Sequence, residues 1–177
     1  MPEDAGRRSY PHLYLLREGA WWAVGEFTDA AGTVSAVRGE TLVRHLPGVW
    51  ICESVLAAAR SGDRARIAEH RNRCEIVPFT AGSRATHWSS QNSSVGKLNG
   101  RFVLAGDAIL SMCSSPTGRY RGMECIQRLA ATRYSARGTL MEEDRVLSTW
   151  SLEIERTHAL TDDEPAEGET LEAPQEP

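Results

Sequence analysis

Apolar and polar residues alternate along nine short stretches of the chain between Trp21 and Arg156. Successive side chains of a β-strand point to opposite faces, so alternation with a period of two is typical of a sheet with one buried face. The pattern is clearest over residues 145–156, where the even positions are apolar except for Ser148. Residues 133–140 have apolar or small residues at the same parity. Both stretches therefore predict strands whose even positions face a core.

Turn-forming residues separate these stretches. Breaks rich in Gly, Pro, Asp and Ser lie at residues 29–32, 47–48, 61–64, 81–83, 95–100 and 116–118, and residues 141–144 are interpreted as a hairpin turn. Short turns between consecutive strands produce an up-and-down meander, and closing the meander removes exposed strand edges. The sequence therefore predicts an all-β fold, a closed antiparallel up-and-down β-barrel of about 8–10 strands, preceded by a short N-terminal segment.

The length of 177 residues is enough for one domain with a hydrophobic core, and we assign that domain to residues 1–158. Residues 159–177 carry seven carboxylates, three prolines and no aromatic residue, and this composition predicts a disordered acidic tail. Without the tail, 17 Asp and Glu residues stand against 20 Lys and Arg. We interpret the tail as a solubilising segment, with loose contact to the more basic barrel as the alternative.

Composition also argues against several partners. No run of eighteen apolar residues is available to cross a membrane, and residues 1–11 lack the apolar segment of an export signal. These features predict a cytoplasmic protein without a membrane partner. The net charge of −4 and the lack of a basic stripe interleaved with aromatic residues argue against nucleic acid. The single lysine, Lys97, lies in a turn-like run and is a poor candidate for a Schiff-base amine.

The cysteines and histidines show no arrangement typical of a metal site. Zinc-ligand spacing is missing among the five histidines, which are His12, His45, His70, His87 and His158. Cys52 and Cys74 are equidistant from Asp63, so a hairpin turn over residues 61–65 would place them directly opposite each other on paired strands. In a reducing compartment, two free thiols are favoured there over a disulfide.

Two short motifs resemble signatures of the calycin superfamily, which includes the lipocalin-like and fatty-acid-binding-like barrels. Gly19-Ala20-Trp21 is similar to the lipocalin Gly-x-Trp, whose Trp closes the barrel floor. Arg156 is placed like the family's arginine that stacks over this Trp in a cation–π contact. The resemblance covers roughly residues 14–156 and is greatest to small bacterial lipocalin-like proteins of unassigned function. Some calycin-like barrels hold haem through a late histidine, but only His158 lies late here, so we expect no cofactor.

A barrel of this size holds either side chains or one small ligand, so inward polar residues are the candidates for function. Extending the even inward face across the turn at Pro116 places four residues inside, namely Tyr120, Gly122, Glu124 and Ile126. Desolvation by apolar neighbours would raise the pKa of Glu124 and suit it to proton transfer. The alternative is that Glu124 pairs with a lumenal arginine and only supports the wall. The candidate catalytic residues are Glu124, Tyr120 and His87.

Ligand-binding candidates come from the aromatic residues and from the predicted inner faces. The strand predicted over residues 101–113 has small residues at Gly106 and Ala108, which leave room either for a ligand or for Trp rings opposite. His87 and Trp88 point to opposite faces, so only one of them can line the lumen. The candidate ligand-binding residues are Trp21, Trp22, Glu40, Glu53, Trp88, Leu104, Ala108, Met112 and Trp150.

Three classes of function fit such a barrel. We predict a small-molecule-binding protein that holds an apolar or amphipathic ligand in its lumen. The alternative is a cofactor-independent cyclase or isomerase of specialised, polyketide-like metabolism, which would fold a flexible substrate while Glu124 or Tyr120 polarises it. The resemblance implies this option, because some barrels that resemble allene oxide cyclase are cyclases. The third class is a structural protein with a filled lumen. A wide, Trp-rich mouth would make a homodimer natural.

Overall fold

The regular structure in the computed structural model consists of β-strands. The structure describes residues 12–59 and 67–157, so the predicted acidic tail, the predicted turn at residues 61–64 and His158 lie outside the described residues. Ten strands follow one another, which are β1 (Gly19–Asp29), β2 (Val34–Leu46), β3 (Val49–Ala59), β4 (Ile67–Ile76), β5 (Ala85–Asn92), β6 (Gly96–Ala105), β7 (Ala108–Ser114), β8 (Tyr120–Arg128), β9 (Arg133–Glu142) and β10 (Arg145–Arg156). None of the described residues belongs to a helix with the length and apolarity needed to cross a membrane.

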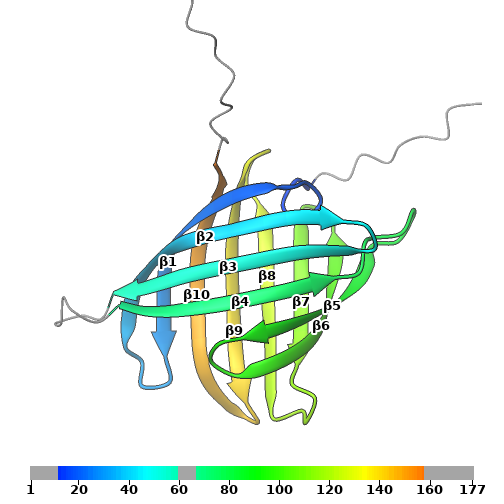
Figure 1. Ribbon diagram of the computed structural model, residues 1–177. Coiled ribbons are helices and arrows are strands. Elements are labelled where there is room, and N and C mark those ends of the chain that lie inside the picture. The colour runs from blue at the N-terminus through cyan, green and yellow to red at the C-terminus, as the bar shows by residue number, and fades with distance from the viewer. Residues whose placement is uncertain (1–11, 60–66, 158–177) are drawn as a thin grey trace, which may run out of the picture.

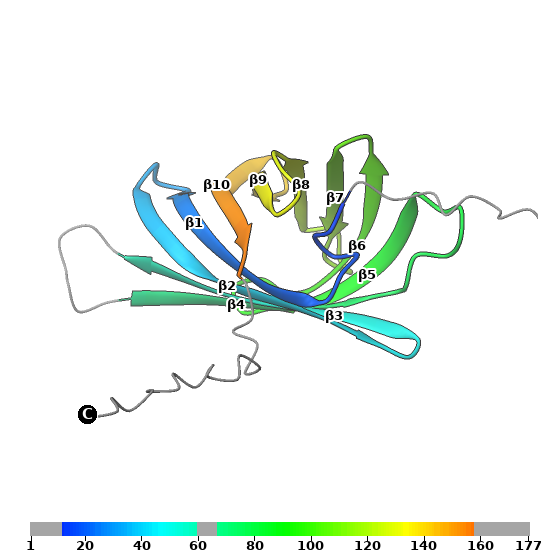
Figure 2. The same ribbon diagram turned by 90° about the horizontal axis from the view of Figure 1, so that it is seen from above.

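The strands form a closed antiparallel barrel. Each strand pairs with the next one in the sequence, and β1 also pairs with β10, which confirms the predicted up-and-down barrel. In Figure 1, β2, β3 and β4 run across the front, whereas β7 to β10 descend steeply behind them. Figure 2 shows the same two groups from above, as opposite walls that curve toward each other. The lumen lies between these walls.

One turn was missed in the sequence, and it changes which residues face the lumen. The predicted single strand over residues 101–113 is two strands, because Gly106, with a positive φ of 64°, and Asp107 form a tight turn between β6 and β7. Ala105 and Ala108 pair directly, so the even positions of β7 share a face with the odd positions of β6. The inner face of β7 therefore consists of odd positions such as Ser111.

A second correction concerns the start of β10. The pairing of β9 with β10 shifts between Val146 and Ser148, as at a β-bulge. Val146, predicted to face inward, is 47% exposed, and Leu147 lines the interior in its place. From Ser148 onward the even positions face inward as predicted, with Leu152 and Ile154 buried.

The segment before β1 closes one end of the barrel. The hydroxyl of Tyr134 accepts a hydrogen bond from the Leu13 amide at 2.8 Å. The ring Nε2 of His12 donates to the Gly106 carbonyl at 3.1 Å. The ring Nε2 of His45 donates to the Leu15 carbonyl at 2.8 Å. These bonds join the N-terminal segment to the β6–β7 turn, β9 and β2, and so fix a floor under the lumen.

Trp21 is the centre of this floor and is fully buried. Its ring lies edge-on to Tyr14 at 5.1 Å and to Tyr134 at 5.6 Å between centroids. The guanidinium carbon of Arg156 lies 5.9 Å from the Trp21 ring centroid, so the predicted cation–π contact is present. Arg156 also donates a hydrogen bond to the Glu18 carbonyl at 2.8 Å. Both ends of the barrel domain thus meet at the same closed end.

The register of β3 and β4 agrees with the prediction from the sequence. Cys52 and Cys74 are directly opposite each other, and both are free thiols. Both side chains are buried and face the lumen. The prediction of an opposed but unbonded pair is therefore correct.

Candidate ligand-binding cavity

The barrel encloses a cavity of about 550 Å³ that is lined by side chains from all ten strands. Its volume falls within the usual range of small-molecule sites, roughly 300–1,000 Å³. Tyr14 and Leu15, from the segment before β1, form its base. The lining is mostly apolar, with Phe102, Ile126 and Leu152 among its members. The lumen is therefore not filled by side chains.

Glu124, in the middle of β8, lines the cavity. Its Oε1 accepts a hydrogen bond from the indole Nε1 of Trp150, on β10, at 2.7 Å. Burial raises the pKa of the Glu124 carboxyl, and the hydrogen bond from Trp150 offsets only part of that rise. An uncharged indole, rather than the lumenal arginine considered in the sequence analysis, is thus the partner of this carboxyl in the structure.

A glycine on the strand between them allows Trp150 to reach Glu124. Gly138 on β9 lies directly between these two residues, because it pairs with Glu124 on one side and with Trp150 on the other. A Cβ atom at Gly138 would lie only 2.3 Å from Cζ2 of the Trp150 ring. The indole therefore lies flat across the backbone of β9, and a larger residue at this position would displace it.

Trp88, on β5, has the same arrangement with a different outcome. It pairs with Gly100 of β6, where a Cβ atom would lie 2.4 Å from Cζ2 of its ring. The Trp88 ring also packs against Phe102 at a centroid distance of 5.6 Å. In contrast to Trp150, the indole Nε1 of Trp88 is buried without a hydrogen-bond partner. Two tryptophans therefore lie flat on glycines in the wall, and only one of them has its N–H satisfied.

Burial favours the neutral forms of Tyr14 and of the thiols that line the cavity. Burial raises the pKa of Tyr14 well above its ordinary value. It raises the pKa of Cys52 to about 12, and it raises the pKa values of Cys74 and Cys113 as well. These thiols are consequently poor nucleophiles at neutral pH. The interior of the cavity thus carries hydroxyl, thiol and carboxyl groups whose uncharged forms are favoured by burial.

Charged residues lie at the other end of the barrel, which forms the mouth. The His70 ring stacks on Phe27 at 5.3 Å, and its Nδ1 lies 3.1 Å from the Ser94 hydroxyl. Arg71 is paired with Glu69 at 2.7 Å. Because His70 and Arg71 both line the cavity near this end, a ligand would meet polar groups first.

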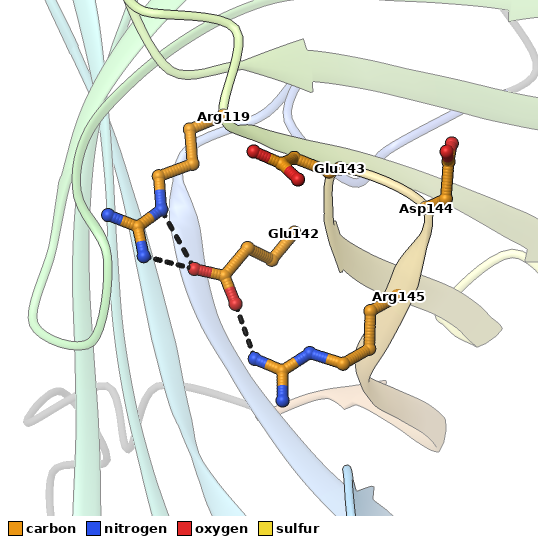
Figure 3. Close-up of a pocket in the computed structure, with 5 residues that line it drawn as sticks. All are labelled: Arg119, Glu142, Glu143, Asp144 and Arg145. Atoms are coloured by element: carbon orange, nitrogen blue, oxygen red, sulfur yellow. Dashed lines mark hydrogen bonds and ion pairs between the residues drawn. The ribbon is translucent and has the colours of Figure 1, made fainter.

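Glu142, the last residue of β9, lies on the opposite side of the mouth. Figure 3 shows its carboxylate between two arginines, Arg119 from the β7–β8 turn and Arg145 from the start of β10. Arg119 donates to it from Nε at 2.8 Å and from Nη2 at 2.5 Å, and Arg145 pairs with its other oxygen. These arginines hold the pKa of Glu142 below its usual range. The surrounding depression on the surface, which Glu143 and Asp144 also line, is shallow, and both of its arginines already pair with Glu142.

The structure brings only some of the predicted site residues to the cavity. Tyr120, Glu124, Trp88 and Trp150 line it. Leu104 is buried without lining the cavity, and Trp21 belongs to the floor. Ala108, at the start of β7, has the even parity that faces outward. These seven positions follow from the strand registers, and their roles stay predictions.

The remaining predicted site residues lie on the outer surface. Trp22 is 44% exposed and Met112 is 47% exposed, while Glu40 and His87 are also exposed. Glu53 pairs with Arg44 at 2.5 Å and with Arg73 at 2.7 Å on the outer face of β3. These side chains do not line the cavity, because each occupies the strand parity opposite to its inward neighbours. Met112 faces outward as a direct result of the turn at Gly106.

Several lining residues were not found by sequence reasoning. Tyr14 and Leu15 come from a segment without strand alternation, so no periodic signal indicates that they reach the lumen. Asn72 and Ser90 follow an alternation, but they are short polar residues that look like surface positions. Gly138 was placed on the inner face, yet its relation to Trp150 depends on strand pairing. Among the described residues, no group of three or more His, Cys, Asp or Glu side chains is arranged to hold a metal ion.

Comparison with known proteins supports the fold alone. No family model matches the chain, and no curated protein matches it. A solved structure that matches is that of an S-type phycobiliprotein lyase from Guillardia theta, with a TM-score of 0.59. The two chains are 9% identical, and the match covers 82% of this chain and 92% of that one. At this identity, the likeness shows a shared barrel architecture.

Proposed function

We propose that this protein binds one small, mostly apolar molecule inside its barrel. The observation that carries the proposal is the enclosed cavity of about 550 Å³, which has an apolar lining and a few buried polar groups. Binding sites for small molecules typically have this composition, because apolar contact supplies affinity and polar groups fix orientation. Trp88 and Trp150 supply flat apolar walls, and Glu124 supplies a polar contact.

The comparison and the sequence motifs support this proposal. The similar structure is that of a phycobiliprotein lyase, so the same barrel architecture occurs in a protein named for an activity on another molecule. Together with the Gly19-Ala20-Trp21 floor and Arg156, this likeness supports a calycin-like origin. We place the protein in the cytoplasm, without nucleic acid or membrane partners, and a homodimer is compatible with the barrel.

A specific observation favours a cyclase or isomerase as the second candidate. Glu124 is a buried carboxyl with a raised pKa, and its Oε1 is held by Trp150 at 2.7 Å. Burial favours the protonated form of this carboxyl, and a protonated carboxylic acid is able to donate its proton to a substrate in the cavity. Tyr120 also lines the cavity and would assist in polarising the substrate. A confined cavity would in addition restrict a flexible substrate to a reactive shape.

Tryptophan fluorescence, titrated with apolar, polyene and polyketide-like compounds, tests both the binding protein and the cyclase or isomerase. Mass spectrometry then identifies the bound material. Saturable quenching with unchanged compound supports binding, and recovery of an isomer or a cyclised product supports catalysis. Glu124→Gln should abolish turnover in an enzyme but only shift affinity in a binding protein.

A variant that fills the cavity provides the control. Ser111→Phe places a large ring on the inner face of β7, whereas Ser114→Phe places the same ring on the outer face of the same strand. The inner variant should lose binding, and the outer variant should bind like the natural chain. If the natural chain binds none of the compounds, or if both variants bind equally well, the proposal is wrong.

A further inference from the structure

The wall formed by β4 and β5 carries polar atoms that have no hydrogen-bond partner. They are the Trp88 Nε1, the Ser90 hydroxyl and the Asn72 side-chain oxygen. Trp88 is 8% exposed and Ser90 is 5% exposed, and all three residues line the cavity. Buried polar atoms in folded proteins are hydrogen-bonded in the great majority of cases. Three unpartnered atoms in one cavity wall therefore indicate a place where a bound molecule completes the hydrogen bonding.

The strand register places Ser90 between the other two residues along this wall. Asn72 pairs with Asn92, and Ser90 is two positions before Asn92 on the same face of β5. Trp88 is a further two positions along that face and pairs with Ile76. We call Asn72, Trp88 and Ser90 the β4–β5 polar subsite. It places a donor, a hydroxyl and an amide in succession along one face of the wall, with Ser90 two positions from Trp88.

The position of the donor is set before a ligand arrives. The Trp88 ring lies across Gly100 and packs against Phe102, so the indole has little freedom to turn. A donor fixed in this way gains affinity for a matching acceptor because little side-chain entropy is lost on binding. A ligand without an acceptor would leave the indole N–H buried and unpaired. The free-energy cost of that unpaired group would favour ligands that carry an acceptor over those that do not.

The charges of the lining restrict the ligand further. Beside Ser90 the ionisable lining groups are Cys74, which pairs with it, and Cys52, and Glu124 is close enough to Cys52 for their charges to interact. Burial favours the uncharged form of each of these groups. His70 and Arg71 lie at the mouth, on the far side of Asn72. The lining residues with lasting charge among those described, Arg71 and Glu142, lie at the mouth and are already paired. An ionised group deep in the cavity would therefore have no countercharge, and burying it would be strongly unfavourable.

We propose that the β4–β5 polar subsite binds the oxygen of an uncharged ligand, a carbonyl or hydroxyl group that accepts a hydrogen bond from Trp88 Nε1. This inference rests on the proposed binding function and specifies its ligand class. The ligand is then a neutral, oxygen-bearing apolar molecule. Neither a pure hydrocarbon nor an anion held deep in the barrel meets the same requirements.

Matched ligands test the inference on the full chain by calorimetric titration. Fluorenone and fluorene share a ring system but differ in one carbonyl oxygen, and benzanthrone and 7H-benz[de]anthracene form a larger pair. Fluorene-9-carboxylate supplies the anion. We expect each ketone to bind about three- to tenfold more tightly than its hydrocarbon, which is the usual effect of one net hydrogen bond. The carboxylate should bind most weakly.

Variants identify the donor. Trp88→Phe keeps an aromatic ring but removes the N–H and part of the apolar surface of the wall. Ketone and hydrocarbon should lose the same apolar contact, so the preference for the ketone should disappear whatever the change in hydrocarbon affinity. Trp22→Phe makes the same replacement on the outer surface and should change nothing. Ser90→Ala, which removes a hydroxyl without adding bulk, should weaken ketone binding if Trp88→Phe does not fold. The infrared carbonyl band of bound fluorenone should lie at lower frequency in the natural chain than in Trp88→Phe.

The outcomes separate this inference from the proposed function. Equal binding of ketone and hydrocarbon, or an unchanged preference and carbonyl band in folded Trp88→Phe, would overturn the polar subsite while leaving a ligand-binding barrel. Tightest binding by the carboxylate would also overturn it. If none of the five compounds binds to the folded chain, both the subsite and the binding function are rejected.

Discussion

Gly138→Ala tests whether the Trp150–Glu124 contact depends on a glycine between them. The new methyl carbon would lie 2.3 Å from Cζ2 and 2.5 Å from Cε2 of the Trp150 ring, and 2.8 Å from the Met123 carbonyl oxygen. Carbon atoms do not approach this closely, so the indole has to move away from β9. Its hydrogen bond to Glu124, now 2.7 Å long, would then break. Gly138 is not among the described glycines with a positive φ, so backbone strain would not contribute to the effect of the substitution.

The magnitude follows from two contributions. Forcing extra volume into a packed site costs about 1–3 kcal/mol, and losing a neutral hydrogen bond costs about 0.5–1.5 kcal/mol. The free energy of unfolding should therefore fall by about 2–4 kcal/mol. Urea denaturation measures this value, and near-ultraviolet circular dichroism reports the displaced indole.

Two controls isolate the cause. Gly122→Ala is a matched change on the inner face of the neighbouring strand, where the new methyl group meets the Cys113 sulfur at 2.9 Å, a side-chain atom that is able to rotate away. It should cost less than Gly138→Ala. In a Trp150→Ala background, Gly138→Ala should cost clearly less, because the clashing ring is gone and only the contact with the Met123 carbonyl oxygen remains. A loss in that background as large as in the natural chain would refute the reasoning.

Three further predictions concern other parts of the barrel. The raised pKa of Glu124 means that the folded protein retains this proton at a pH where the unfolded chain has lost it, so the free energy of unfolding should fall as pH rises from the ordinary carboxyl range to the raised pKa. Urea denaturation at several pH values should show less of this fall in Glu124→Gln. An identical pH profile for the variant and the natural chain would contradict this prediction. Exposed Cys125 should react with a thiol reagent at neutral pH well before buried Cys52, because burial raises the pKa of Cys52 to about 12. Mass spectrometry of the modified peptides measures the order of reaction, and earlier modification of Cys52 would contradict this prediction. Arg156→Leu should lower the free energy of unfolding by about 1–3 kcal/mol, because it removes the cation–π contact with Trp21 and the hydrogen bond to the Glu18 carbonyl. An unchanged urea midpoint would show that these two interactions do not stabilise the closed end of the barrel.

Local patterns in the chain were sufficient to predict the architecture. Strand alternation depends on the backbone of each residue and its neighbours, so it predicted the inner faces of β8, β9 and most of β10. The symmetric spacing around Asp63 predicted the opposed pair Cys52 and Cys74 for the same reason, since a hairpin turn sets the register of its two strands. Where a local signal was missed, as at Gly106, every later residue of the strand was assigned to the wrong face.

The candidate site depended on contacts between residues far apart in the sequence. Trp150 reaches Glu124 only because Gly138 lies between them in the closed sheet, and Trp88 lies on Gly100 for an equivalent reason. Tyr14 reaches the base of the cavity because hydrogen bonds anchor its segment across the barrel end. The alternation of apolar and polar residues thus determined by itself that the chain forms a barrel. The tertiary structure decided what the barrel is able to hold, because the shape and unpaired polar atoms of a cavity arise only when distant strands come together.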